Sequence, residues 1–456
     1  MKKKIQLAIL LIATSTLFNL SCQKETINST VSENAATEAA SSNLQAQGHL
    51  KQTKTFSSHV VTSWINMQLT MLRIPLPAGT GSQASDRAQA YSGIALYEAV
   101  MPGMPAYKSL TGQLAGLPVM PSTEPGKAYH WAASANAALA EISRRLFPTT
   151  ADANKTAMNN LENNLKTSYA DEVDAATLQR SVAFGRQVAT RVANWAATDG
   201  FANVNPPYVA PVGPGLWVPT STTPAINAFA YQRRYMVPGS ANGTALQPLP
   251  TFSTDPASAF YAMVKQVYDS SFVLTTDQKA MANYYKDNPG YGAGGGFVWI
   301  LQEAFKIAQL TLDQAAVAYA KVGMAQHEAT IVLNTDKYIF NVIRPVTYIK
   351  AYINSAWTTY IPTPNHPEFP SGHATTNGAV LSMMINVFGD NFPMTLRIYD
   401  YLGYGARSYA SFTAIGKDMA DSRFYGGLHY KETCEKSLVQ GKKVAQNILE
   451  KIDFKK

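Results

Sequence analysis

The sequence predicts an all-α fold, built from helical bundles packed around a polar centre. Apolar residues recur at helical spacing from about residue 57 onward, and alternating strand-like patterns are scarce. A chain of 456 residues that is 46% hydrophobic is also long enough to bury a large core. These observations together favour a large, all-helical body.

The N-terminus differs from this helical body. A basic start (residues 2–4) and an apolar run ending at Leu20 precede Ser21-Cys22. This pattern indicates a secretory signal over residues 1–21. The small residue before Cys22 resembles a bacterial lipobox, which implies lipid attachment at Cys22 and a location in the bacterial cell envelope. The apolar run is too short and too interrupted for a transmembrane anchor.

Residues 22–55 are rich in Ser, Thr, Ala and Asn and contain almost no large apolar residues. Such a segment buries too little surface to offset its ordering entropy, so we interpret it as a flexible tether. The catalytic body is then expected over residues 56–456. With Cys22 lipidated, the second cysteine, Cys434, has no partner for an intramolecular disulfide, and its helical surroundings favour a passive role.

Helices are expected at positions where apolar residues share one face. In 174–199, Leu178, Val182 and Val188 lie on one stripe, and Gly200 provides a stop signal. The other expected helices, in order, cover 85–100, 130–146, 257–270, 276–286, 298–333, 373–388 and 434–451. Between them, residues 200–255 are rich in Pro and Gly, which is compatible equally with a binding loop and with a surface wrap.

The net charge of +8, from 38 basic and 30 acidic residues, is spread along the chain. A nucleic-acid partner requires a basic stripe on one face. No long Lys/Arg run follows the first residues, so we expect no nucleic-acid partner. A small anionic substrate or cofactor fits this charge better.

Three short motifs between residues 337 and 429 combine basic residues with histidines. They offer three fixed cations, two imidazoles, a hydroxyl and a glycine N–H, which suit a tetrahedral oxyanion. The motifs are Lys337 with Arg344-Pro345, then Ser371-Gly372-His373 after Pro370, and finally Ser422-Arg423 with His429.

The spacing within each motif allows its side chains to meet. Lys337 and Arg344 are nearly two helical turns apart and can share one face. Ser371 lies where a loop is expected to become a helix, whose N-terminus favours an anion. His429 follows a Gly-Gly turn and can point back at the centre that Arg423 faces.

The set K-x6-RP, PSGH and SR-x5-H resembles the signature shared by vanadium-dependent haloperoxidases and the type-2 phosphatidic acid phosphatase (acid phosphatase) superfamily. The segments 87–100, 215–225, 274–290 and 344–349 resemble the bacterial haloperoxidase branch. The resemblance implies helical bundles that hold vanadate, or phosphate in the same site. The three motifs alone do not separate a peroxidase from a phosphatase.

The resemblance also implies roles for single residues. His429 matches the apical ligand of vanadium, which in phosphatases is the nucleophile that forms a phosphohistidine. His373 matches the acid–base histidine. Lys337 matches the lysine that acts on bound hydrogen peroxide. The residues that match the clamp on the oxyanion's oxygens are Lys337, Arg344, Ser371, Gly372, His373 and Arg423.

Three further positions are compared with the family. His366 stands where haloperoxidases have an aromatic residue or a histidine, and a plain loop histidine is an equal alternative. Asp287 stands where an acidic residue often supports the clamp, and a surface Asp at a helix end is an equal alternative. Asn334 replaces a Trp that lines the halide site in many haloperoxidases. The aromatic wall is then missing or comes from elsewhere, for example from Tyr284, Tyr285, Phe369 or Phe424.

The favoured function is a vanadate-dependent haloperoxidase that uses hydrogen peroxide and a halide or small organic substrate. The runner-up is an acid phosphatase with a phosphohistidine at His429. Its soluble members are shorter, and its membrane members carry several spans, whereas no run after Cys22 approaches about 20 apolar residues. A third alternative is a non-catalytic surface lipoprotein. Two imidazoles that face one centre argue against it.

Overall fold

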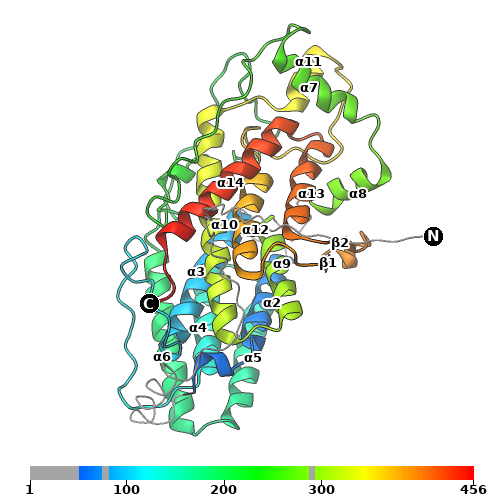
Figure 1. The fold of residues 1–456 in the computed structure, drawn as a ribbon. Helices are drawn as coiled ribbons and strands as arrows, with labels where there is room; N and C mark the ends of the chain where they lie inside the picture. The colour runs from blue at the N-terminus through cyan, green and yellow to red at the C-terminus, as the bar shows by residue number, and fades with distance from the viewer. Residues whose placement is uncertain (1–50, 74–81, 287–292) are drawn as a thin grey trace, which may run out of the picture.

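The computed structural model describes residues 51–73, 82–286 and 293–456, and it confirms the all-α prediction (Figure 1). The predicted signal segment, Cys22 and most of the predicted tether lie outside the described residues. The last residues of that predicted tether belong to the folded body. The Thr53 hydroxyl is buried and donates to the Val100 carbonyl at 2.8 Å, and the Lys51 carbonyl accepts from the Trp131 indole at 2.7 Å.

The first half of the chain forms one helical bundle. Its helices are α2 (His59–Arg73), α3 (Ser82–Val100), α4 (Trp131–Leu146), α5 (Asp152–Ala170) and α6 (Ala175–Ala196). Helix α4 packs against α3, α5 and α6. The Pro- and Gly-rich stretch after α6 contains only the short 3-10 helix η3 (Ala230–Gln232) and runs mostly over the surface.

The second half adds a further bundle and a small β-ribbon. Its helices are α7 (Ala259–Ser270), α8 (Thr276–Tyr284), α9 (Ala293–Ala308), α10 (Leu312–Phe340), α11 (Pro345–Tyr352), α12 (Gly372–Phe388), α13 (Phe412–Tyr425) and α14 (Lys431–Lys451). Strands β1 (Met394–Leu396) and β2 (Arg407–Tyr409) pair antiparallel, with Met394 opposite Tyr409. The remaining 3-10 turns are η1 (Thr53–Thr55), η2 (Met101–Gly103) and η4 (Asp400–Leu402).

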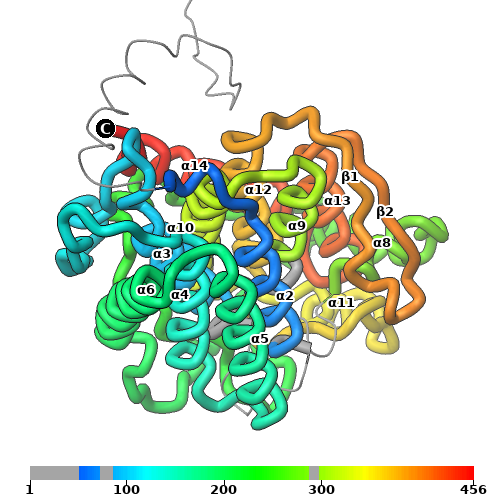
Figure 2. Tube along the Cα trace, turned by 90° about the horizontal axis from the view of Figure 1, so that it is seen from below, coloured from blue at the N-terminus to red at the C-terminus, as the bar shows by residue number. Residues whose placement is uncertain are grey.

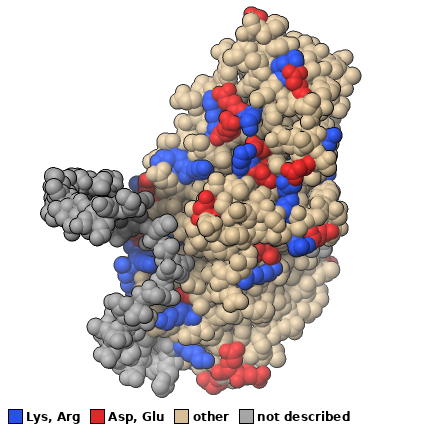
Figure 3. All heavy atoms as spheres, turned by 45° about the vertical axis from the view of Figure 1, so that its right-hand side comes forward, with Lys and Arg blue, Asp and Glu red and all other residues tan. Residues whose placement is uncertain are grey.

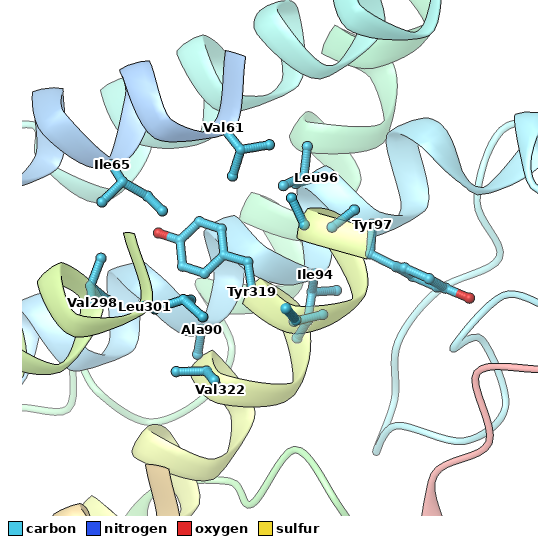
Figure 4. Packing of buried hydrophobic residues seen from close by; sticks show 14 of the residues in the cluster. Val61, Ile65, Ala90, Ile94, Leu96, Tyr97, Val298, Leu301, Tyr319 and Val322 are labelled. Carbon is cyan, nitrogen blue, oxygen red and sulfur yellow. The ribbon is translucent and has the colours of Figure 1, made fainter. Parts of the chain in front are cut away.

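Helix α10 joins the two bundles. It packs against α3 on one side and against α12 on the other, as Figure 2 shows from below. In Figure 4, Tyr319 of α10 lies among Val61 and Ile65 of α2 and Leu301 of α9. Its hydroxyl donates to the Gln68 amide at 2.5 Å, so this buried polar group is satisfied. The long helix therefore carries the core of the first bundle directly into the second.

One expected helix is two helices in the structure. Residues 298–333 were expected as a single element, but α9 ends at Ala308 and α10 begins at Leu312 and extends to Phe340. Gln309 reverses the chain with a φ of 49°, and a capping box between Thr311 and Gln314 starts the new helix. The longer α10 places Lys337 on a helix. The expectation that Lys337 and Arg344 share one helical face is not met, because α10 ends at Phe340, Asn341 has a φ of 51° and Arg344 is the N-cap of α11.

On the face seen in Figure 3, Lys and Arg side chains alternate with Asp and Glu side chains. Within the described ranges, no helix combines the length and apolar character needed to cross a bilayer.

Candidate active site

The structure brings the three motifs together between α10, α12 and α13. Lys337 lies in the last turn of α10, Arg344 caps the start of α11, and Ser371 caps the start of α12. Arg423 lies in the last turn of α13, and His429 follows in the loop before α14. We call the group formed by Lys337, Arg344, Ser371, Arg423 and His429 the cage. All five residues are buried.

A glycine turn directs His429 back toward α13. Gly427 has a φ of 76°, a conformation that favours glycine. The Leu428 amide then donates to the Arg423 carbonyl at 3.1 Å, which closes the end of α13. This turn explains how two residues of one motif, six positions apart, reach the same centre.

Arg344 connects the segments of the cage through its guanidinium. Its Nε donates to the His366 carbonyl at 2.9 Å, and one terminal nitrogen donates to the Leu428 carbonyl at 2.9 Å. That same nitrogen lies 3.4 Å from Nε2 of His429. The other terminal nitrogen lies 2.9 Å from Nδ1 of His366. All four contacts hold loop residues in place. Arg344 therefore fixes the shape of the cage and also contributes a positive charge to it.

Lys337 binds the turn that leads into Ser371. Its ammonium donates to the carbonyls of Pro367 at 3.0 Å and Glu368 at 3.3 Å, and also to that of Pro370. An ammonium has three N–H groups, and all three are directed at this turn. Lys337 thus fixes the backbone before Ser371 and places a buried positive charge beside the cage.

Ser371 presents an unsatisfied hydroxyl at the N-terminus of α12. Its backbone N–H donates to the Ser437 hydroxyl at 2.8 Å, but its own Oγ is buried and has no hydrogen-bond partner among the described residues. A methyl group added at Gly372 would meet Leu333 at 3.6 Å, an ordinary contact, so protein packing does not demand glycine there. A buried hydroxyl without a partner is costly, and a bound oxyanion would satisfy it.

His373 lies at the edge of the cage and is half-buried. It lines a small, mainly apolar cavity of about 20 Å³ together with Tyr284, Tyr285, Trp299 and Tyr399. Arg423 borders the same region, because its guanidinium donates to the Tyr285 carbonyl at 2.8 Å. The imidazole is therefore placed between a basic cage and an apolar cavity.

The cavity has an aromatic wall, which partly differs from the expected one. Of the four aromatic residues proposed as substitutes for the missing Trp, Tyr284 and Tyr285 line the cavity. Phe369 instead packs against Phe340 with ring centroids 4.9 Å apart, and Phe424 belongs to a separate hydrophobic cluster. The sequence reasoning missed Trp299 of α9 and Tyr399, because nothing in their local sequence ties them to the motifs.

The structure also shows the surroundings of His366 and Asn334, two positions that the sequence comparison singled out. His366 is bound to Arg344 through both its ring and its carbonyl, so it is part of the cage's border. Asn334 is buried and donates to the Thr330 carbonyl of its own helix at 2.8 Å, and it is not among the residues that line the cavity. Asp287 lies outside the described residues.

Glu368 is a site residue that the sequence reasoning missed. Its carboxylate is fully buried and lies 2.9 Å from Nδ1 of His429. The same carboxylate accepts from the Tyr430 amide at 3.1 Å and from the Thr433 hydroxyl at 2.9 Å. An acidic residue two positions before Pro-Ser-Gly-His, in a loop flanked by basic motifs, was the signal available for it.

Burial and repulsion between like charges both shift the pKa values of the charged groups in and beside the cage. Burial lowers the pKa of Lys337 well below its ordinary value, and the charges of Arg344 and Arg423 lower it further. Burial also lowers the pKa of Arg344 to about 10, although Glu368 opposes this shift. The pKa of Glu368 is raised to about 7 by burial, against the pull of Arg344 and Lys337. Concentrated positive charge in a desolvated site favours an anionic occupant.

These residues fit vanadate or phosphate. Arg344, Arg423, the Ser371 hydroxyl and the N-terminus of α12 can bind oxyanion oxygens. Lys337 adds a buried positive charge beside them, and Nε2 of His429 faces the same centre. Across the described ranges, no group of three or more His, Cys, Asp or Glu residues could bind a metal cation.

Comparison with known proteins shows a related domain and a similar fold. Residues 317–454 match the family described as the VCPO second helical-bundle domain. The structure is similar to that of the first bacterial vanadium-dependent iodoperoxidase to be crystallised. The TM-score is 0.79 and the identity 28%, over 88% of this chain and 97% of that one.

Two bacterial vanadium-dependent chloroperoxidase structures share the fold. The holo form has a TM-score of 0.63 and 17% identity, over 83% of this chain and 93% of that one. The apo form has a TM-score of 0.61 and 16% identity, over 83% and 96%. No curated protein sequence matches the chain. The fold and the match of residues 317–454 therefore support a relationship of this chain to the superfamily of the bacterial vanadium-dependent haloperoxidases.

Proposed function

We propose that this chain is a vanadate-dependent haloperoxidase that oxidises a halide with hydrogen peroxide. The observation that supports this most strongly is the cage itself. The cage combines three buried cations with a buried Ser371 hydroxyl that has no partner among the described residues, and Nε2 of His429 lies beside the Arg344 guanidinium. The iodoperoxidase and chloroperoxidase structures that share the fold support the same reaction class.

The chain's own residues have distinct tasks in this proposal. Bound vanadate would supply a Lewis acid that activates hydrogen peroxide, while the vanadium keeps its own oxidation state. Nε2 of His429 would hold the metal, and the charges of Lys337, Arg344 and Arg423 would balance the negative charge of its oxygens. The Ser371 hydroxyl and the Gly372 N–H donate to those oxygens. His373, half-buried beside the cage, accepts and returns the proton of the peroxide.

The cavity next to His373 suits a halide. Its volume of about 20 Å³ holds roughly one water-sized group, which is too little for an organic substrate. Tyr284, Tyr285, Trp299 and Tyr399 give it a mainly apolar lining. A weakly hydrated anion loses little hydration on entering such a cavity, and the positive charge of the neighbouring cage attracts it. A small organic molecule would then meet the oxidised halogen outside the cavity.

Phosphatase activity through a phosphohistidine at His429 is the second candidate. It is favoured by the hydrogen bond between Nδ1 of His429 and the buried Glu368, which leaves Nε2 as the nucleophilic nitrogen. The two candidates use the same cage. A paired assay separates them: halide oxidation with peroxide on vanadate-loaded protein, and hydrolysis of an aryl phosphate on vanadate-free protein.

Vanadate-free protein should gain peroxidase activity when vanadate is added and lose it again in excess phosphate. The reason is that both tetrahedral anions compete for Lys337, Arg344 and Arg423. The measurement is the initial rate of halide oxidation across a vanadate titration, with and without phosphate. Peroxidase activity that responds to neither anion would refute the proposal.

We also propose that the protein is lipid-anchored at Cys22 in the cell envelope. Cys22→Ser should release the protein from the membrane without changing its thermal unfolding, because the folded body begins well after this position. Detergent partitioning of the wild-type protein and the variant is the measurement. A variant that partitions with the membrane as fully as the wild-type protein would reject the anchor.

A further inference from the structure

We propose that Glu368 is the positioning residue that fixes the tautomer and the direction of the His429 imidazole. This inference rests on the proposed function, because it assigns His429 as the residue that binds vanadate. The carboxylate lies 2.9 Å from Nδ1 of His429, and both side chains are almost fully buried. Each oxygen of Glu368 already accepts a hydrogen bond, one from the Tyr430 amide and one from the Thr433 hydroxyl, so the carboxylate acts as an acceptor and Nδ1 carries the proton.

The other side of the ring requires the same tautomer. Nε2 of His429 lies 3.4 Å from a terminal nitrogen of Arg344, and a guanidinium can only donate. Nε2 must therefore present its lone pair. This is the atom that faces the cage, and a lone pair is what a bond to vanadium requires. Glu368 and Arg344 thus act on opposite edges of one ring to make Nε2 the ligand atom.

Glu368 is held independently of His429, so it can impose an orientation on the ring. The Tyr430 amide donates to the same oxygen that His429 contacts, and the Thr433 hydroxyl donates to the other oxygen. The backbone of Glu368 is fixed as well. Its N–H donates to the Val342 carbonyl at 3.0 Å, and its carbonyl accepts from the Lys337 ammonium at 3.3 Å.

These contacts also couple the three motifs to the ring. The turn that carries Glu368 is bound by Lys337 of the first motif and leads directly into Ser371 of the second. The carboxylate then contacts His429 of the third motif. A residue outside all three motifs thus sets the geometry of the ligand that completes the cage.

The test compares two variants of Glu368 with a matched control. In Glu368→Gln the amide oxygen can still accept from Nδ1 of His429 and from the Tyr430 N–H, so position is kept and charge is removed. In Glu368→Ala both acceptors are lost. The control is Glu328→Gln, because Glu328 is also fully buried and accepts from Met236 and Val237 without contacting a histidine.

The first readout is the tautomer of His429 in vanadate-free protein. Nitrogen-15 NMR of histidine-labelled protein resolves the seven imidazoles, and the spectrum of His429→Ala assigns the relevant one. Wild type, Glu368→Gln and the Glu328→Gln control should show a protonated Nδ1 and an unprotonated Nε2. Glu368→Ala should show a mixture of the two tautomers.

The second readout is the dissociation constant for vanadate. Glu368→Ala should weaken binding by about 10–100-fold, the range typical for residues that orient a metal ligand. Glu368→Gln should retain most of the affinity, and the control should retain all of it. An unchanged tautomer and affinity in Glu368→Ala would overturn the proposal. An equal loss in Glu368→Gln and Glu368→Ala would also overturn it, because charge rather than position would then be responsible.

The two readouts separate this inference from the proposed function. The tautomer is measured without vanadate, so it tests Glu368 even if the wild-type protein does not bind vanadate. Absence of vanadate binding in the wild-type protein would reject the proposed function. A wild-type tautomer protonated on Nε2 would reject the role of Glu368.

Discussion

Replacing His429 by alanine should abolish tight vanadate binding, whereas His373→Ala should retain much of it and lose most turnover. The His429 ring lies inside the cage, is almost fully buried, and directs Nε2 at the centre. Its loss removes a direct bond to the metal, so affinity should fall by more than the roughly 100-fold seen for outer supporting residues. His373 is half-buried at the edge and contributes a hydrogen bond and a proton relay. Its loss should slow turnover by about 10²–10⁴-fold.

A vanadate titration of the two variants separates these roles even if both look inactive in a peroxidase assay. His327→Gln is the control for loss of a buried imidazole. His327 lies on α10, but its ring packs against Tyr91 of the first bundle, 6.0 Å away between centroids. This control should bind vanadate like the wild-type protein. Wild-type affinity in both His429→Ala and His373→Ala would show that neither residue touches the cofactor.

Gly441→Ala should destabilise the protein by about 3 kcal/mol or more, despite alanine's higher helix propensity. A Cβ at Gly441 of α14 would lie 1.8 Å from the Thr375 carbonyl oxygen of α12 and 2.7 Å from the Ala379 nitrogen. These atoms are backbone, so the helices must separate. The free energy of unfolding by chemical denaturation is the measurement.

The matched control for this change is Gly416→Ala in α13. Its Cβ would meet the Leu381 side chain at 3.4 Å, which that side chain can accommodate. This variant should be as stable as the wild-type protein, or more stable. Separation of α12 from α14 should also weaken vanadate binding, because Ser437 of α14 accepts the N–H of Ser371. Equal free energies of unfolding for Gly441→Ala and Gly416→Ala would contradict the close packing of α14 against α12 at Gly441.

The sequence predicted the residues of the cage because their order and spacing are local. Lys337 and Arg344 were expected to meet through their separation along the chain, and Ser371 through a loop that becomes a helix. The structure places Ser371 in this way, but Lys337 and Arg344 do not share a helical face, because α10 ends at Phe340 and Arg344 precedes α11. The all-α fold was predictable for the same reason, since helical periodicity is read within a few turns. The break before α10 was also local, but the capping box of Thr311 and Gln314 was overlooked.

The site residues that the sequence analysis missed depend on contacts between segments that lie far apart along the chain. Glu368 meets His429 across 61 positions, and that contact exists only once both loops have folded. The aromatic wall beside His373 combines Trp299 of α9 with Tyr399, which follows β1. Neither residue lies near a motif in the sequence. The family comparison directed attention to the Asn334 position, while the structure builds the wall from other elements.

The location of vanadium in the protein is the most direct test of the central claim, that the three motifs form one vanadate site. Crystals soaked with vanadate and measured at the vanadium absorption edge would show the metal by its anomalous scattering. The account predicts one strong peak within bonding distance of Nε2 of His429, with Arg344, Arg423 and Ser371 around its oxygens. A peak elsewhere in the protein, or no peak under conditions that give peroxidase activity, would contradict it.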